Sequence, residues 1–291
     1  MTNQQQQRAL LSLITKPDNI SEYDIAQALD KILPLDLYTL KLQLKAIPPN
    51  IIASIPLPLA EKSLELLRFL GCTAFAPTTN QLKQLGPTRK IKEIHLNPQG
   101  LNFELWRSNP TTINPENIDV IIKAKITTTT KKKPFSTDRG PLYLSQADTI
   151  GPLGAVALDW MNHDEYDDNQ SAEWDAPPFS KSSAHGKTSH WKLDIHTTTN
   201  TVYQIDGPKF AFNFLGSSKD VSELTNINQT TDFLTNLAPL AIIDTFFDSF
   251  NAPPDSQSFR IPGNLLSKDD PTFAFYSRWA ALVYRYLAQQ Y

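Results

Sequence analysis

Side chains that could hold a metal ion gather between residues 163 and 196. The imidazoles and carboxylates of this stretch include His163, Asp164, Glu165, Asp167, Asp168, His185, His190 and His196. Imidazole nitrogens and carboxylate oxygens are common ligands of zinc. His190 and His196 are an even number of residues apart, so one regular strand would carry both on the same face. A metal-dependent hydrolase that uses His163, His190, His196 and the acidic residues is therefore one hypothesis.

The spacing of these residues nevertheless matches no metal or catalytic motif. The acidic stretch lacks the alternating aspartates of a calcium loop, and no two histidines are four residues apart. The chain has no Gly-x-Ser-x-Gly elbow and no glycine-rich phosphate loop, and its one cysteine, Cys72, falls in an expected buried strand. A solvated acidic loop beside surface histidines is the favoured interpretation. We therefore predict a chain that is not an enzyme, with no catalytic residue, no bound metal and no cofactor.

A second candidate is the basic run Lys131, Lys132 and Lys133, with Lys123 and Lys125 nearby. Such a run could bind phosphate groups of lipid or nucleic acid, but each lysine near an anionic membrane contributes only about 1 kcal/mol. The acidic block that follows would oppose this attraction, and the whole chain carries a net charge of −3. We therefore expect neither a nucleic acid nor a membrane as partner. Binding to an anionic membrane surface through Lys131–Lys133 is kept as a second alternative.

Composition places the chain among folded proteins of ordinary size. Its 291 residues are 40% hydrophobic and 20% charged, enough for two domains. No segment has the apolar core of a signal peptide or the ~20 apolar residues of a membrane span. A single cysteine fits a reducing compartment, so we expect a bacterial-type cytoplasmic protein.

Residues 21–77 predict a small α/β module that follows a flexible segment at residues 1–20. Ser21 with Asp24 forms the sequence of a capping box, and Asp36 can cap a second helix. The β-branched run from Ile51 to Ile55 predicts a strand, and a leucine-rich helix then ends near Gly71. A last short strand runs from Cys72 to Phe75.

This order resembles the C-terminal domain of the ribosomal stalk protein L7/L12. The resemblance lies in Ala46-Ile47-Pro48 before the strand, in Ala60 inside the next helix, and in Leu70-Gly71-Cys72 at the last turn. It implies a protein-docking module with no chemistry of its own. The stretch from Leu33 to Lys41 keeps one lysine where the family presents several, so binding of a translation factor is not carried over. Its extra leucine and tyrosine side chains are expected to pack on the second domain or on a partner.

A proline- and glycine-punctuated linker is expected at residues 78–90, and a β-rich domain at residues 91–291. Alternating apolar residues predict strands near 91–96, 101–106, 118–126, 191–195, 202–205 and 210–214. Residues 228–237 and 271–287 predict helices, and the second carries an aromatic stripe that is expected to be core. An acidic insertion at about 127–188 is expected to be a solvated loop, except for residues 151–160, which are expected to dock.

The pattern of Gly100-Leu101, Trp106 and Glu116-Asn117-Ile118 resembles uncharacterised bacterial proteins with a pleckstrin-homology-like barrel. The expected fold class is therefore α+β: a helix–strand–helix–strand module followed by an antiparallel, barrel-like domain with a C-terminal helix. An open α+β sheet with the same strands is the alternative. The function predicted from this architecture is protein–protein interaction, as an adaptor or accessory protein whose partner is another protein.

Overall fold

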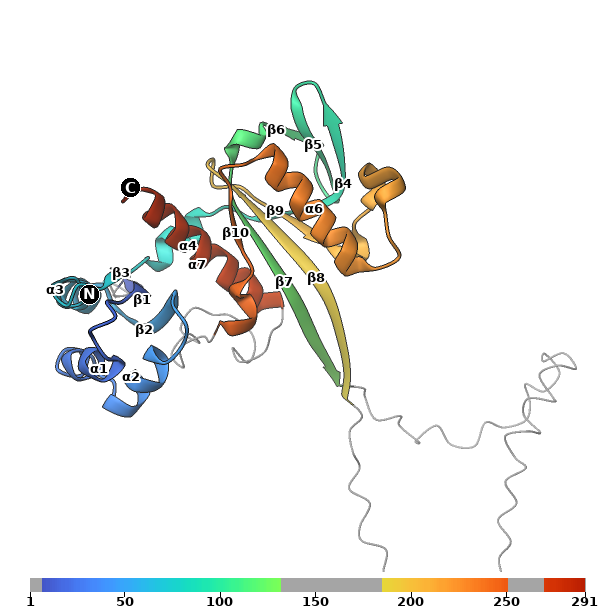
Figure 1. The fold of residues 1–291 in the computed structure, drawn as a ribbon. Coiled ribbons are helices and arrows are strands. Elements are labelled where there is room, and N and C mark those ends of the chain that lie inside the picture. The colour runs from blue at the N-terminus through green and yellow to red at the C-terminus, as the bar shows by residue number, and fades with distance from the viewer. Residues whose placement is uncertain (1–6, 132–184, 251–269, 291) are drawn as a thin grey trace, which may run out of the picture. The chain divides into compact units, whose positions relative to one another are not determined.

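In the computed structural model, which describes residues 7–131, 185–250 and 270–290, the strands form two sheets (Figure 1). One sheet has three strands in the order β2-β1-β3, and the other has seven in the order β10-β7-β8-β9-β4-β5-β6. The strands are β1 (Arg8–Thr15), β2 (Asn50–Pro56), β3 (Thr73–Phe75), β4 (Thr88–Asn97), β5 (Gly100–Leu105), β6 (Thr111–Ile113), β7 (Ile118–Lys131), β8 (His185–Thr197), β9 (Val202–Asp206) and β10 (Ile242–Asp244).

Helices connect these strands and cover the sheets. The α-helices are α1 (Glu22–Asp30), α2 (Leu37–Leu44), α3 (Leu57–Phe69), α4 (Thr79–Gln84), α6 (Glu223–Leu237) and α7 (Asp270–Ala288). Short 3-10 helices are η1 (Pro115–Asn117), η3 (Gly207–Lys209), η4 (Phe212–Ser218) and η5 (Phe246–Ser249).

The module predicted over residues 21–77 forms in the predicted order of helices and strands. Ser21 caps α1, and its hydroxyl and the Asp24 carboxylate each accept a backbone N–H at 3.2 Å, which completes the capping box. Asp36 caps α2 by accepting the Thr39 N–H at 2.9 Å. After α3 the chain turns at Gly71, whose φ of +75° belongs to the left-handed region that glycine adopts without strain. Local capping and turn chemistry therefore fixed these boundaries.

The flexible segment expected at residues 1–20 contains a buried strand, so that prediction was wrong. β1 is the central strand of its sheet and pairs antiparallel with both β2 and β3. Ala9, Leu11 and Leu13 pack among α1, α2 and α3, while Leu10 and Ile14 pack in the cluster that contains α7. A strand buried on both faces has a continuous apolar sequence, so β1 lacks the alternation by which strands are usually recognised.

The linker expected at residues 78–90 is also structured. Thr78 and Gln81 form a second capping box at the start of α4, with the Thr78 N–H bonded to Gln81 Oε1 at 2.8 Å. Leu82 and Leu85 are buried, and β4 begins at Thr88. The prolines and glycine of this stretch mark the ends of α4.

The β-rich domain is a mixed open sheet, which corrects the expectation of an antiparallel barrel. β10 pairs parallel with β7, and β4 pairs parallel with β9, while β4 with β5, β5 with β6, and β8 with β9 pair antiparallel. Within the described residues, the strand order ends at β10 and β6 and does not close. The strand predicted at residues 210–214 is wrong, because Phe210 and Phe212 stack edge-on in a 3-10 turn that makes one isolated bridge with β4.

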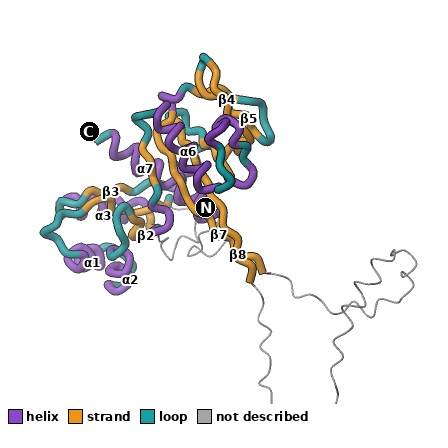
Figure 2. Tube along the Cα trace, turned by 45° about the vertical axis from the view of Figure 1, so that its right-hand side comes forward, coloured by secondary structure: helices purple, strands orange, loops and turns teal. Residues whose placement is uncertain are grey.

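The two long C-terminal helices cover opposite faces of the seven-stranded sheet (Figures 1 and 2). Ile227 and Leu234 of α6 pack on the face that presents Leu193 and Ile195 of β8. Trp279 and Val283 of α7 pack on the other face, so the aromatic stripe is core, as predicted. Trp279 also donates its indole N–H to Ser12 Oγ at 2.9 Å, which joins α7 to β1.

The insertion expected at about 127–188 is described only at its ends. The threonine run after Ile126 belongs to β7, which continues to Lys131, and β8 begins at His185, so the strands reach further into this stretch than expected. The expected docking segment at residues 151–160 lies outside the described residues.

Replacing Trp279 with alanine is expected to lower the free energy of unfolding by about 3–5 kcal/mol, because the change opens a large cavity in a closed core. Urea denaturation of the full chain measures this loss. Trp106→Ala is the matched control, since Trp106 is 50% exposed and its removal should change stability by no more than about 0.5 kcal/mol. Equal losses in the two variants would contradict the assignment of α7 to the core.

Candidate functional site

A stripe of polar side chains lies buried on the face of β8 and β9 that α7 covers. Its residues on β8 are the alternating Lys192, Asp194 and His196. On β9, Asp206 lies opposite Lys192 and Gln204 lies opposite Asp194. All five are at most 6% exposed. Buried polar groups are costly unless they are hydrogen-bonded, so this stripe is the first place to look for chemistry.

Three of the residue types found in hydrolases meet in this stripe. Ser277 of α7 donates its hydroxyl hydrogen to Asp194 Oδ2 at 2.6 Å, and its oxygen lies 2.7 Å from His196 Nε2. Gln204 donates to the other carboxylate oxygen of Asp194 at 2.8 Å. Because Ser277 donates its hydroxyl hydrogen to Asp194, its oxygen accepts from His196. The imidazole of His196 therefore carries its hydrogen on Nε2 and donates it to Ser277 Oγ.

This order differs from that of a catalytic triad. In a triad the imidazole lies between serine and carboxylate and takes the serine proton, whereas here the serine lies between the other two. Burial, together with the charges of Arg285 and Arg278, lowers the pKa of His196 to about 3, so the imidazole is neutral. Burial also raises the pKa of Asp194, against the hydrogen bonds from Ser277 and Gln204. No substrate reaches residues that are this buried, so the stripe holds α7 on the sheet.

A second buried carboxylate, Asp244 at the end of β10, is surrounded by donors. Tyr276 donates to it at 2.8 Å, Tyr284 donates at 2.8 Å, and the Phe246 N–H donates at 2.7 Å. Burial raises the pKa of both tyrosines, and the neighbouring carboxylate raises it further, so both hydroxyls keep their protons. Asp244 is thus an anchor for α7 and offers no open position for a ligand.

The two described histidines of the predicted metal site, His190 and His196, do not come together. His196 lies in the buried stripe, and His190 lies with Nε2 3.7 Å from Asp206 Oδ1. Six residues along one strand span ~20 Å, so these histidines cannot share an ion. Of the remaining candidates, His163, Lys132 and Lys133 lie outside the described residues, and Lys131 is the last residue of β7. Cys72 is buried, as predicted, and burial raises the pKa of its thiol.

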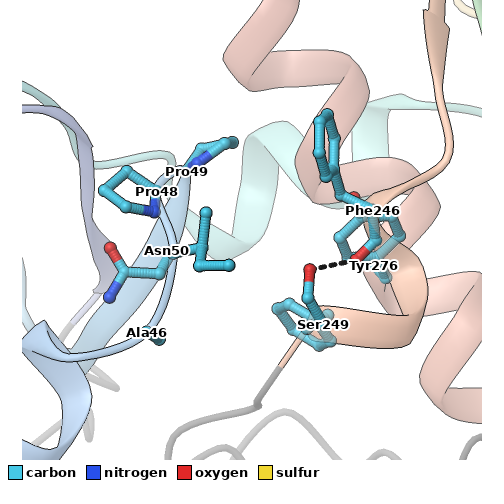
Figure 3. Close-up of a pocket in the computed structure, with 9 residues that line it drawn as sticks. Ala46, Pro48, Pro49, Asn50, Phe246, Ser249 and Tyr276 are labelled. Carbon is cyan, nitrogen blue, oxygen red and sulfur yellow. Dashed lines mark hydrogen bonds between the residues drawn. The ribbon is translucent and has the colours of Figure 1, made fainter.

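One hollow beside Pro48 and another beside Arg285 hold no convergent set of reactive groups. The first lies between Pro48 and Asn50 on one side and Phe246 and Tyr276 on the other, where Ser249 donates to the Phe246 carbonyl at 2.8 Å (Figure 3). Its volume of about 10 Å³ suits a single water. The second, of about 240 Å³, is lined mainly by amides and aromatic rings around Arg285.

Arg285 is already engaged by protein groups. It forms an ion pair with Asp119 at 2.5 Å and donates to Asn200 Oδ1 at 2.8 Å and to the Thr197 carbonyl at 2.7 Å. Its charge therefore fastens the end of α7 to the sheet, and it is not free for an anionic ligand.

Exposed apolar side chains also occur on α1, on α2 and in the loop after α2. Tyr38 is 76% exposed, Ile47 69% and Leu42 58%. Tyr38 and Leu42 are four residues apart on α2 and share its outer face. Tyr23 of α1 adds a half-exposed ring, and the Lys41 ammonium lies 4.1 Å from the centre of that ring. We call Tyr23, Tyr38, Leu42 and Ile47 the α1–α2 surface.

Part of this surface could be expected from the sequence. The excess of apolar side chains in and after the stretch from Leu33 to Lys41 was visible, and packing on a partner was one of two expectations for it. Leu42 and Ile47 could not be separated from core residues by spacing, because α2 has apolar residues on several faces. Only the burial of Leu40 and Leu44 shows which face is turned outward.

Comparison of the chain with models of known protein families, with curated proteins and with solved structures finds no match to any of them. Among the described residues, no helix combines the length and the apolar character that a membrane span requires.

The buried imidazole of His196 makes the free energy of unfolding depend on pH. Because its pKa is lower in the folded chain than in the unfolded chain, unfolding takes up a proton between pH 6.5 and about 3. The stabilising contribution is complete above pH 6.5 and is lost as the pH falls through this window. His196→Gln keeps an amide donor for Ser277 but does not titrate. The advantage of wild type over this variant should shrink on acidification, by an amount on the order of a few kcal/mol.

Chemical denaturation at a series of pH values measures that difference. Asp194, whose pKa is raised, acts with the opposite sign, and it is present in both proteins, so the comparison isolates the imidazole. A difference between the two proteins that stays constant across the window would show that His196 does not resist protonation.

Proposed function

We propose that the chain is a non-catalytic adaptor of the cytoplasm that binds another protein through the α1–α2 surface. The observation that carries the proposal is the exposure of Tyr38, Leu42 and Ile47 on one small module. Exposed apolar groups that share one helix face, as Tyr38 and Leu42 do, are typical of interaction sites, and tyrosine is enriched in the centres of such sites. Single scattered apolar residues would carry no such meaning.

Charge around the surface indicates the kind of partner. α2 contains no acidic residue, Lys41 lies on it, and Lys45 follows it directly. The acids nearby are on α1, which carries Glu22, Asp24 and Asp30, and at the start of α2, where Asp36 accepts the Thr39 N–H. The surface is therefore apolar with a basic border on the side of α2 and an acidic one on the side of α1. It fits an amphipathic helix whose apolar side is flanked by acidic residues, a common mode of peptide recognition.

The same proposal includes the two resemblances. The order of helices and strands over residues 21–77 supports a module like the C-terminal domain of the stalk protein. The replacement of that family's lysines by leucine and tyrosine supports a different partner. For the β-rich domain, two groups of strands followed by a terminal helix support a pleckstrin-homology-like ancestry, with the sheet left open.

The test replaces Leu42 with a photoactivatable phenylalanine analogue in the full chain. Cross-linking in native lysate should yield one dominant protein adduct, because the surface accepts a specific partner. Phe69, which is exposed on α3, carries the same analogue as the control position. Adducts of equal yield and identity at both positions would contradict a specific site.

Binding of the identified partner is then measured with purified proteins. Leu42→Asp and Tyr38→Asp should each weaken it by about 10-fold or more, since a central apolar contact contributes over ~1 kcal/mol and the added charge repels an acidic helix. Phe69→Asp should leave the dissociation constant unchanged. Equal affinity of all variants would overturn the α1–α2 surface as the site, and cross-links to lipid alone would favour a membrane surface instead.

A further inference from the structure

A different surface, on the hairpin of β4 and β5, brings one imidazole and two carboxylates together. In the part of the chain that the structure describes, Glu93, His95 and Glu104 are one group whose nitrogen and oxygen atoms all lie within 4.8 Å of one another. His95 Nε2 is 3.9 Å from Glu93 Oε2 and 3.9 Å from Glu104 Oε2. These separations are too long for hydrogen bonds, so the three groups face a common space without bonding across it.

The backbone produces this convergence through a bulge in β4. The register shifts between Ile91 and Glu93, which places Glu93 directly opposite Glu104 and keeps both Ile91 and Ile94 in the core. His95 follows on the same outer face, two residues along the strand. Two like charges directly opposite each other destabilise a sheet, so a cation between the two carboxylates would stabilise this one.

The second oxygen of each carboxylate is held by another side chain. Asn213 donates to Glu93 Oε1 at 3.1 Å, and Lys92 donates to Glu104 Oε1 at 2.6 Å. The other oxygen of each carboxylate, Oε2, lies 3.9 Å from His95 Nε2.

The distances suit a small divalent ion. Zinc bonds to imidazole nitrogen and carboxylate oxygen at about 2.0–2.2 Å, so two of its ligands lie ~3.4 Å apart in a tetrahedron. The present 3.9 Å separations need to close by only ~0.5 Å, which surface side chains achieve by small rotations. A nitrogen donor with two carboxylates also favours zinc over calcium and magnesium, which prefer oxygen ligands alone.

We propose that Glu93, His95 and Glu104 bind a zinc ion, with Asn213 and Lys92 orienting the two carboxylates. The site is independent of the α1–α2 surface. The bound ion would link the β4–β5 hairpin to η4, which carries Asn213. A solvent molecule would be the fourth ligand of the ion.

Calorimetric titration of zinc into the full chain, first freed of metal with a chelator, tests the site. Because further histidines and acids lie elsewhere in the sequence, the measure is the difference between variants. His95→Ala should lose one equivalent of bound zinc, and Asn213→Ala should bind that equivalent about 10-fold more weakly, as for other supporting residues of metal sites. His190→Ala is the control and should keep it.

His95 is 51% exposed, so its removal is not expected to disturb folding, and circular dichroism checks this. Glu104→Gln is a second variant of the same shape that lacks the charge, and it should also lose the equivalent. Zinc binding of equal stoichiometry and affinity in wild type, His95→Ala and Glu104→Gln would overturn the proposal.

Discussion

The packing of α7 is the constraint on which the rest of the fold depends. This helix contacts β1 through Trp279 and Ser12, β8 through Ser277 and Asp194, and β10 through Tyr276 and Asp244. The two sheets share no strand, so these contacts join them. Helix α7 is at the end of the chain, and the contacts that it makes link residues more than 80 positions apart in two of the three cases. Such long-range contacts close large loops of the chain. The chain entropy lost in closing these loops has to be offset by the burial of apolar surface.

The interface of α7 is unusual in combining aromatic packing with buried polar groups. Toward β7 the helix packs on apolar residues such as Val120 and Ile122, with the ion pair of Arg285 and Asp119 near its end, whereas toward β8 and β10 it meets the buried Asp194 and Asp244. Each of these carboxylates accepts at least two hydrogen bonds, so its burial is compensated. A shifted helix would leave them unpaired in the core, at a cost of several kcal/mol. Polar partners thus define one position of α7, while the aromatic rings supply most of the driving force.

Sequence reasoning succeeded where local signals decide structure and failed where distant contacts do. The helices after Ser21 and Asp36 were predicted from their caps, and the turn at Gly71 from its glycine. β1 was missed because its burial on both faces depends on α1–α3 and on α7, so no alternation marks it. The group of Glu93, His95 and Glu104 was also missed. The pairing of Glu93 with Glu104 depends on a bulge, and a register shift of one residue cannot be inferred from a single strand.

The burial of β1 also decides which surfaces of the N-terminal module remain open to a partner. Helices α1, α2 and α3 cover one face of its sheet, where Leu11 and Leu13 are buried. The other face carries Leu10 and Ile14 into the cluster of α7, so no partner can bind to the sheet itself. Binding is left to the outer sides of the helices, and among them α2 carries apolar residues beside lysines without acids. Because α7 covers this face of the sheet, the surfaces left for a partner include α1 and α2.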